Sequence, residues 1–219
     1  WIGTYSSGLW RIGADGSIDK FDTAEGLLNN SVRSLFEDAE RTLWVGTNSG
    51  LESLTMGKFV TIGPTEGLSD VYTRSVFQDR AGNIWIGTAQ GLNRISGTET
   101  KVFTKADGLT SDYVFAFAET PDGAIWIGTS RGLNRLDQGR FTSYQESEGL
   151  PTPTVRALHC DRSGTLWIGA GSGALRLAGG TFERVLPAEG WDTIYVQSFV
   201  EGKDGALWLG SDGGGIARY

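Results

Sequence analysis

The chain has 219 residues, among them 33 glycines, eight tryptophans and only five prolines. Its formal net charge of −7 argues against a nucleic-acid partner, because neutralising phosphates requires clustered lysine and arginine. Cys160 is the only cysteine, which excludes an internal disulfide and a cysteine zinc site. No apolar run is long enough to span a bilayer, so we expect no membrane insertion by this segment.

The motif W-[IVL]-G recurs along the whole chain at a spacing of 41 to 43 residues. Four short strands and their turns need about 40 residues, which is the length of one β-propeller blade. We therefore predict an all-β fold, a β-propeller of four-stranded antiparallel blades that forms a single domain over residues 1–219. Five to six blade positions are expected, with incomplete terminal blades. The repeats start at Trp1, Trp44, Trp85, Trp126 and Trp167, and a partial repeat starts at Trp208.

In chain order, the N-terminal part supplies the second, third and fourth strands of a blade and ends near Phe21. Each full period then begins with a largely apolar strand a, such as 32–37, followed by a turn and strand b, such as 84–88. Strand c follows, as at 91–95, and strand d carries an aromatic or apolar pair three residues apart. The last part supplies strands a to c. One extra residue before Gly8 and before Gly215 predicts a bulge or a longer turn there.

Binding residues are expected on the face where the loops that enter strand a and the loops between strands b and c converge, because propellers commonly bind ligands there. The residue eleven positions before each tryptophan is arginine three times, and aromatic residues recur two positions earlier. Arginines beside aromatic rings suit a sugar, whose C–H groups stack while its hydroxyls or carboxylate accept hydrogen bonds. The predicted ligand-binding residues are Arg33, Arg74, Arg156, Gln197, Tyr72, Tyr113, Tyr195 and Trp191, with Phe115 completing the ring.

A structural interpretation of the same residues is that the arginines stack on neighbouring blades and cap backbone carbonyls. The motif tryptophans are expected in the core, and the aspartates of the a-to-b turns are expected to cap turn amides rather than to bind metal. His159 occupies a position held by apolar residues in other repeats, so we expect it to pack between blades. No catalytic residue, metal site or cofactor is predicted.

The strings V-R-S-L-F-E-D (32–38), L-W-V-G-T (43–47) and E-G-L (66–68), with their later copies, resemble the two-component regulator propeller repeat. The resemblance covers nearly the whole chain. It implies a sensory role, similar to the extracytoplasmic sensor region of a membrane-bound histidine kinase, and a periplasmic or extracellular location. Some members of that family sense oligosaccharides. The chain opens inside a repeat, so we expect a mature or excised fragment.

Three functional classes stay open at this point. The first is a non-catalytic binding propeller that recognises a carbohydrate-like ligand or a partner domain. The second is a structural or engineered scaffold that self-associates through its incomplete terminal blades, because open sheet edges favour pairing between chains. The third is a propeller lyase or hydrolase, which would need a non-repeating cluster of acid and base that the sequence does not show.

Overall fold

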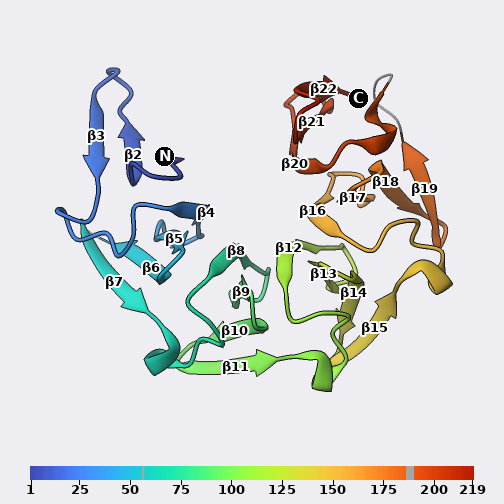
Figure 1. Ribbon diagram of the computed structural model, residues 1–219, viewed down its shortest axis with the longest axis horizontal. Helices are drawn as coiled ribbons and strands as arrows, with labels where there is room; N and C mark the ends of the chain where they lie inside the picture. Colours follow the sequence, from blue (N-terminus) through green and yellow to red (C-terminus); the bar gives the residue numbers. More distant parts are fainter. Residues whose placement is uncertain (56, 186–189) are drawn as a thin grey trace. The chain divides into compact units, whose positions relative to one another are not determined.

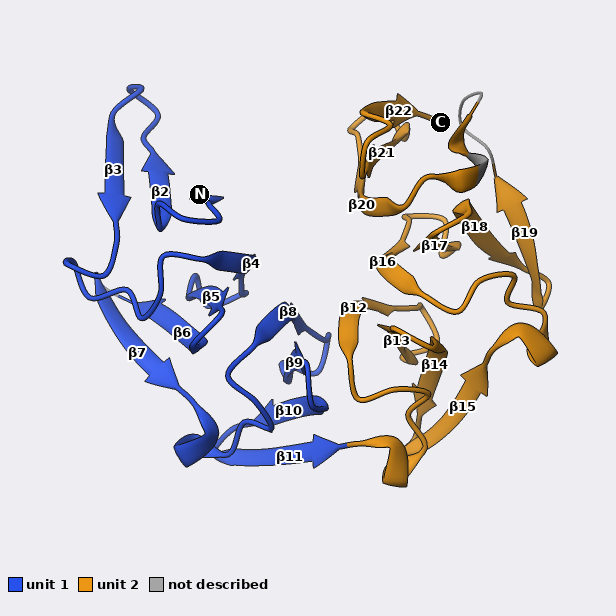
Figure 2. Ribbon diagram, viewed as in Figure 1, with its two compact units in different colours: residues 1–103 blue, residues 104–219 orange. Residues whose placement is uncertain are grey.

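The computed structural model describes residues 1–55, 57–185 and 190–219. The chain divides into two compact units, Trp1–Phe103 and Thr104–Tyr219 (Figure 2). Each unit contains three antiparallel sheets in its described residues, and the strands of a sheet are neighbours in chain order (Figure 1). Such a meander of short strands is the blade of a propeller.

Unit 1 begins with a three-stranded sheet and continues with two four-stranded sheets. The first sheet is β1 (Ile2–Gly3), β2 (Leu9–Ile12) and β3 (Ile18–Phe21). The second is β4 (Val32–Glu37), β5 (Leu43–Thr47), β6 (Gly50–Thr55) and β7 (Lys58–Ile62). After the short helix η1 (Pro64–Glu66), the third is β8 (Thr73–Gln78), β9 (Ile84–Thr88), β10 (Leu92–Ser96) and β11 (Glu99–Phe103).

Unit 2 has two four-stranded sheets and ends with a three-stranded one. After η2 (Lys105–Asp107), the first is β12 (Val114–Glu119), β13 (Ile125–Thr129), β14 (Gly132–Asp137) and β15 (Arg140–Tyr144). After η3 (Glu146–Glu148), the second is β16 (Val155–Cys160), β17 (Leu166–Ala170), β18 (Gly173–Ala178) and β19 (Thr181–Val185). After η4 (Trp191–Thr193), the third is β20 (Val196–Glu201), β21 (Leu207–Ser211) and β22 (Ile216–Arg218).

This arrangement confirms the predicted all-β propeller fold with six blade positions and incomplete terminal blades. The first sheet lacks strand a and the last lacks strand d in the described residues. The longer turns predicted near Gly8 and Gly215 are also confirmed. Thr4 N and Ser211 N bond to carbonyls four residues ahead, whereas Thr88 N bonds to one three residues ahead.

The core lies between successive sheets, because the central strands are apolar on both faces. In unit 1, Leu51 of the second sheet packs with Ile84 and Ile86 of the third, and Trp44 joins this cluster. In unit 2, Trp126 and Leu133 of the first sheet pack with Ile168 of the second. Within each unit, successive sheets therefore bury their facing surfaces against one another.

Four connections between sheets contain the recurring string E-G-L or D-G-L, in which the chain reverses direction. Gly67 ends η1 in the left-handed region at φ 100°, where a residue with a Cβ is disfavoured. The chain then reverses, and Leu68 N donates to Gly63 O. This reversal puts the Leu68 side chain in the core at 4% exposure, and Leu27, Leu109 and Leu150 are buried in the same way.

The motif tryptophans lie in the core at Trp85, Trp126 and Trp167, which are 3–4% exposed. The prediction that all of them do so is wrong at Trp1 and Trp208, which are 41% and 43% exposed. A tryptophan on strand b points toward the following sheet, so its burial depends on that sheet as well as on its own.

Candidate functional site

All five strands a carry a β-bulge near their first residue. The pairing of strands a and b shifts register across one residue in each of the four-stranded sheets and in the last sheet. A bulge leaves one extra residue unpaired and re-aims its side chain. The five bulged residues are the predicted ring positions, Arg33, Arg74, Phe115, Arg156 and Gln197.

The residue before each bulge anchors it to the core. Val32, Thr73, Val114, Val155 and Val196 are at most 8% exposed. The bulged side chains themselves are half-buried or exposed. At each of these five strand ends the backbone of the bulged residue is therefore fixed by the core. Its side chain can contact a ligand or a neighbouring blade. In the sequence these residues stand eleven positions before each motif tryptophan, and in the structure the same positions carry the bulge.

In unit 2, the Arg156 guanidinium lies between two aromatic rings. Its Cζ is 4.5 Å from the centroid of the Tyr195 ring and 5.9 Å from that of Phe115. Tyr113 meets Phe115 edge-on, with 5.0 Å between ring centroids. Cation–π contacts of this kind hold a guanidinium in place without neutralising it. Predicted site residues from three different sheets, Tyr113, Phe115, Arg156 and Tyr195, are thus brought together.

The charge of Arg156 has no carboxylate partner within the described residues of the chain. Its Nε is buried, and no acceptor in that part of the chain is placed to receive its hydrogen. Other arginines of unit 2 are paired: Arg176 Nε donates to Glu183 at 2.8 Å, and Arg218 Nη2 donates to Asp204 at 2.9 Å. The buried Nε cannot reach a ligand, so the donors that Arg156 offers to an acidic or hydroxylated ligand are its terminal Nη groups.

In unit 1, Arg33 is held by a different set of partners. Its Nε donates to Asn48 Oδ1 at 2.8 Å, and its Cζ lies 4.6 Å from the centroid of the Tyr5 ring. Tyr72 is 48% exposed, two residues before the half-buried Arg74 on β8. Arg33 thus repeats the stacking of Arg156 on an aromatic ring, with a neutral hydrogen-bond partner added.

The sequence points to the turns between strands b and c but identifies no residue in them, and these turns supply partners to the bulged residues. Tyr5 and Asn48 lie in such turns, and so does Asp212, which accepts from Gln197 Nε2 at 3.4 Å. Each follows its motif tryptophan by four residues, so the repeat register could have identified them. The turns are tied to strand a by backbone bonds such as Asn48 N to Ser31 O.

Trp191 lies elsewhere. It belongs to η4, is 4% exposed, and packs in a core cluster with Trp167, Val196 and Leu209. A buried ring of this kind stabilises the last two sheets of unit 2 and offers no face to a ligand. Because the repeat places a leucine at this position in four other copies, core packing is the simpler account of the tryptophan as well.

The turn aspartates cap amides, as predicted, and they also bind the motif tryptophans. Asp79 Oδ1 accepts Asn83 N at 2.8 Å, while its Oδ2 accepts Trp85 Nε1 at 2.7 Å. Burial acts to raise the pKa of Asp161, but hydrogen bonds from Ser163, Trp167 and Thr165 together lower it. Within the described residues, no group of three His, Cys, Asp or Glu side chains is arranged to hold a metal ion.

His159 packs between sheets, as the sequence predicts. It stacks on Phe199 with 6.5 Å between ring centroids, and burial lowers its pKa although Glu201 lies 3.9 Å away. Glu201 is itself engaged by the preceding sheet, since its Oε2 accepts Arg162 N at 3.0 Å. In unit 1, Gln78 accepts Ala39 N in the same way, also at 3.0 Å. The side chain that ends strand a therefore ties adjacent sheets together at Gln78 and Glu201.

A family model described as "Two component regulator propeller" matches residues 26–49, 67–90, 108–131 and 149–172. Each matched copy runs from the glycine after a connecting turn through strands a and b to the b–c turn. It therefore contains the bulge, the turn aspartate or its replacement, and the motif tryptophan. Among curated protein sequences, none matches the chain significantly.

Solved structures share the fold. The extracellular domain of a protein described as a hybrid two-component system of B. thetaiotaomicron aligns over 100% of this chain and 32% of its own, with a TM-score of 0.86 and 20% identity. A second extracellular domain from B. thetaiotaomicron, described as part of a one-component system, aligns over 100% and 33%, with a TM-score of 0.82 and 18% identity. The chain thus spans about a third of these two domains.

Propellers of another function align as well. A catalytically inactive virginiamycin B lyase from Staphylococcus aureus, crystallised with quinupristin, aligns over 97% of this chain and 73% of its own. Its TM-score is 0.77 and its identity 14%. At such identities the structural likeness describes the fold alone. No helix within the described residues is long and apolar enough to cross a membrane.

Proposed function

Because four of its repeats match the two-component regulator propeller model, we propose that the chain is a non-catalytic sensor module that binds a carbohydrate-like ligand. The proposed binding surface lies in unit 2 and consists of the bulged residues Phe115, Arg156 and Gln197 with Tyr113 and Tyr195. The observation that carries the proposal is Arg156, a guanidinium with no carboxylate partner in the described chain, held between Phe115 and Tyr195. An uncompensated cation in a chain of net charge −7 favours an anionic or hydroxyl-rich partner.

The chemistry of this surface fits a sugar better than a flat aromatic ligand. A guanidinium donates in a planar fork that matches a carboxylate or a pair of hydroxyls. The exposed ring of Tyr195 offers a face on which sugar C–H groups stack. Because both groups stand on core-anchored strand ends, the surface is organised before the ligand arrives, which reduces the cost of binding.

A sensor of this kind acts outside the cytoplasm in the proteins it resembles, since the two B. thetaiotaomicron structures are extracellular domains. We place the chain in the same compartment. Ligand binding could change other domains of a signalling protein only if the ligand has different affinities for two conformational states of the propeller. The cluster of Tyr113, Phe115, Arg156 and Tyr195 links three sheets and so is suited to couple them.

The test is calorimetric titration of the 219-residue protein with a panel of acidic and neutral oligosaccharides. For a saturable ligand, Arg156→Ala is expected to weaken binding about ten-fold or more, because it removes charged hydrogen bonds. The matched control is Arg176→Ala, which removes an exposed arginine of the same unit that is already paired with Glu183. Equal binding by both variants, or no saturable ligand across the panel, would contradict the proposal.

A further inference from the structure

The turn between strands b and c carries a recurring position, four residues after each motif tryptophan. In two sheets this residue binds the bulged residue of its own sheet. Asn48 Oδ1 accepts a hydrogen bond from Arg33 Nε at 2.8 Å, and Asp212 Oδ2 accepts one from Gln197 Nε2 at 3.4 Å. The position can therefore supply a partner to the bulged residue beside it. Its six occupants are Tyr5, Asn48, Ala89, Ser130, Gly171 and Asp212.

The sheet that contains Arg156 has a glycine at this position. Gly171 has no side chain, so it cannot give Arg156 the acceptor that Asn48 gives Arg33. The atom of Arg156 that has no acceptor in the described chain is Nε, which is the same atom that Arg33 donates to Asn48. The glycine in the turn therefore accounts for the unpartnered Nε.

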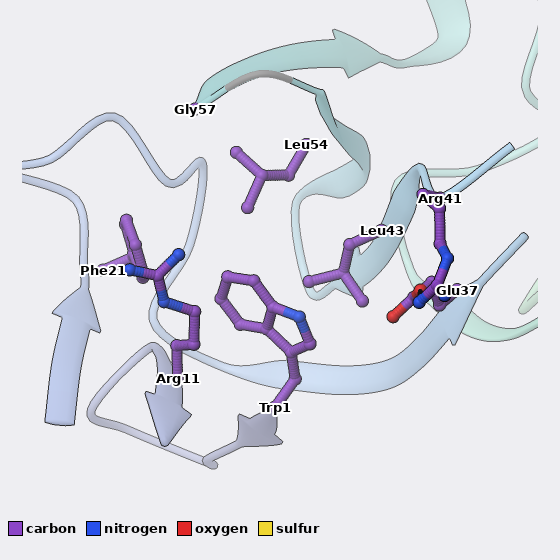
Figure 3. A pocket seen from close by; sticks show the side chains of 8 residues that line it. All are labelled: Trp1, Arg11, Phe21, Glu37, Arg41, Leu43, Leu54 and Gly57. Carbon is purple, nitrogen blue, oxygen red and sulfur yellow. Dashed lines mark hydrogen bonds and ion pairs between the residues drawn. The ribbon is translucent and has the colours of Figure 1, made fainter. Parts of the chain in front are cut away.

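The two arginines beside the cavity of unit 1 are paired, in contrast to Arg156. Arg11 and Arg41 line this cavity, which Figure 3 shows from close by. Arg11 Nε donates to Asp19 Oδ2 at 2.9 Å, and Arg41 Nη1 donates to Glu37 Oε1 at 2.9 Å. Both guanidinium charges are compensated there, so that cavity does not repeat the chemistry of the surface around Arg156.

The space beside Gly171 is occupied by the Tyr195 ring of the following sheet. A Cβ atom at Gly171 would lie 2.6 Å from Tyr195 Cε1, 2.8 Å from Cζ and 3.0 Å from Oη. Atoms do not approach so closely, so the ring would have to move. Gly171 lies outside the left-handed region in which the backbone itself favours glycine. The Tyr195 ring is therefore the reason that a side chain does not fit at Gly171.

The main chain around Tyr195 is held in place from two sheets. Ile194 O accepts Gly173 N at 3.1 Å, and Tyr195 O accepts Asp212 N at 2.9 Å. The next residue, Val196, is fully buried. A Cβ atom at Gly171 would consequently displace the Tyr195 ring rather than its backbone. Because this ring stacks on the Arg156 guanidinium at 4.5 Å, the displacement would release Arg156 as well.

We propose that Gly171 is a positioning residue for the binding surface of unit 2, acting through Tyr195 on Arg156. It withholds the acceptor that the same turn supplies in two other sheets, and it leaves the space that the Tyr195 ring needs. Arg156 is then held by aromatic rings, and its Nη donors stay available to a ligand. This inference rests on the proposed function, since positioning Arg156 matters only for a surface that binds.

The first experiment observes Arg156 directly by NMR of arginine Nε–Hε groups, with the resonance assigned from its loss in Arg156→Lys. Its Hε is expected upfield in the wild type, because the Tyr195 ring shields nearby protons. Gly171→Ala should move it downfield by most of that displacement. Gly171→Asn should move it further, toward the Arg33 resonance, because the new amide oxygen accepts the Nε hydrogen as Asn48 does for Arg33.

The matched control is Asp212→Ala, which changes the same turn position in the neighbouring sheet. It removes the bond to Gln197 but keeps the backbone bond from position 212 to Tyr195 O. The Arg156 resonance is expected to stay in place. An Arg156 resonance that Gly171→Ala leaves unchanged, or that Asp212→Ala shifts as far, would overturn the proposal.

The second experiment tests whether Gly171 acts through the Tyr195 ring. Gly171→Ala is expected to lower the melting temperature of the wild type. In a Tyr195→Ala background the same change should raise it slightly, because the clash is gone and alanine reduces the entropy of the unfolded chain. The same sign in both backgrounds would overturn the proposal. If Gly171→Ala alone does not fold, recovery of folding with Tyr195→Ala supports the proposal, and no recovery overturns it.

Neither experiment uses a sugar, so the two proposals fail separately. A panel of oligosaccharides without a saturable ligand contradicts the proposed function, whereas the Arg156 resonance still reports whether Gly171 positions the guanidinium. Saturable sugar binding together with an Arg156 resonance that does not respond to Gly171→Ala would overturn the role of Gly171 alone.

Discussion

Trp167 and Trp208 hold the same repeat position in the last two sheets of unit 2, yet one is 4% exposed and the other 43%. Trp167 packs with Leu207 and Leu209 of the following sheet and meets the Tyr219 ring at 5.2 Å. No following sheet covers Trp208 within the described residues of the unit. The comparison teaches that a blade of this repeat supplies half of an interface, and that stability comes largely from the neighbour.

The largest expected effect follows directly from that difference. Trp167→Ala should lower the free energy of unfolding by about 3 to 5 kcal/mol, because it leaves a cavity between two sheets. Trp208→Ala should cost about 1 kcal/mol or less, since Trp208 is already 43% exposed to solvent and leaves no closed cavity. Chemical denaturation of both variants measures the two values. Similar losses would mean that the interface between sheets is not the main source of stability.

The turn before each tryptophan sharpens the comparison, because Asp161 precedes Trp167 while Gly202 stands at the same place before Trp208. Asp161→Ala removes acceptors for Trp167 Nε1 and for the amides of Ser163 and Thr165. We expect a loss of about 2 kcal/mol near neutral pH. Asp161→Asn, which keeps one side-chain oxygen, is the control and should lose less.

Acid should reduce this penalty. The folded protein lowers the pKa of Asp161 below its ordinary value of 3.8, so the carboxylate stabilises the fold above that value. The contribution is lost as the pH falls through the lowered pKa. Denaturation of the wild type and Asp161→Ala should therefore converge at strongly acidic pH. A difference that is independent of pH would show that packing, rather than the charged acceptor, accounts for the loss.

The period of the tryptophan motif is enough to predict the blade, five to six blade positions, and the recurring position that carries the bulge. The bulge could not be predicted, because it depends on the pairing between strands a and b. The stacking of Arg156 on Tyr195 joins two sheets, so predicting it requires the distance between those sheets. A sequence pattern within one repeat does not contain that distance. The sequence places Trp191 in the loop before strand a, which is correct, but it does not show that the side chain is buried. Its assignment to the binding surface is therefore wrong.

Glu52 and Asn93 hold the same repeat position in two sheets of unit 1, and substitutions there should change the stability by a smaller amount. Glu52 on β6 is fully buried and accepts only the Leu28 amide, whereas Asn93 on β10 accepts Ser69 N and also donates to Ser69 Oγ. Burial raises the pKa of Glu52 above its ordinary value of 4.5, so the folded state holds the proton more tightly than the unfolded state. Stability therefore falls as the pH rises from 4.5 through the raised pKa.

Glu52→Gln should consequently stabilise the protein by about 1 kcal/mol at neutral pH, since a neutral amide keeps the acceptor and adds a donor. The advantage should disappear below about pH 4, where Glu52 is protonated in both states. The reverse change in the next sheet, Asn93→Asp, should destabilise the protein at neutral pH. Thermal unfolding at several pH values measures both, and a gain for Glu52→Gln that persists in acid would contradict the assignment.

The smallest expected effect concerns the a–b turn of the second sheet. Arg41 adopts φ 66° at the position where Gly82, Gly123, Gly164 and Gly205 have φ between 82° and 86°. A residue with a Cβ in this left-handed region destabilises the folded state by about 1 kcal/mol, and glycine removes that strain. Part of the gain is lost because glycine also increases the conformational entropy of the unfolded chain. Arg41→Gly also removes the exposed pair with Glu37, which contributes little. We therefore expect a net gain of about 0.5 kcal/mol, measured against Arg80→Gly as a control in the neighbouring turn. A clear loss of stability would show that Arg41 makes a stronger contact with Glu37 than its exposure indicates.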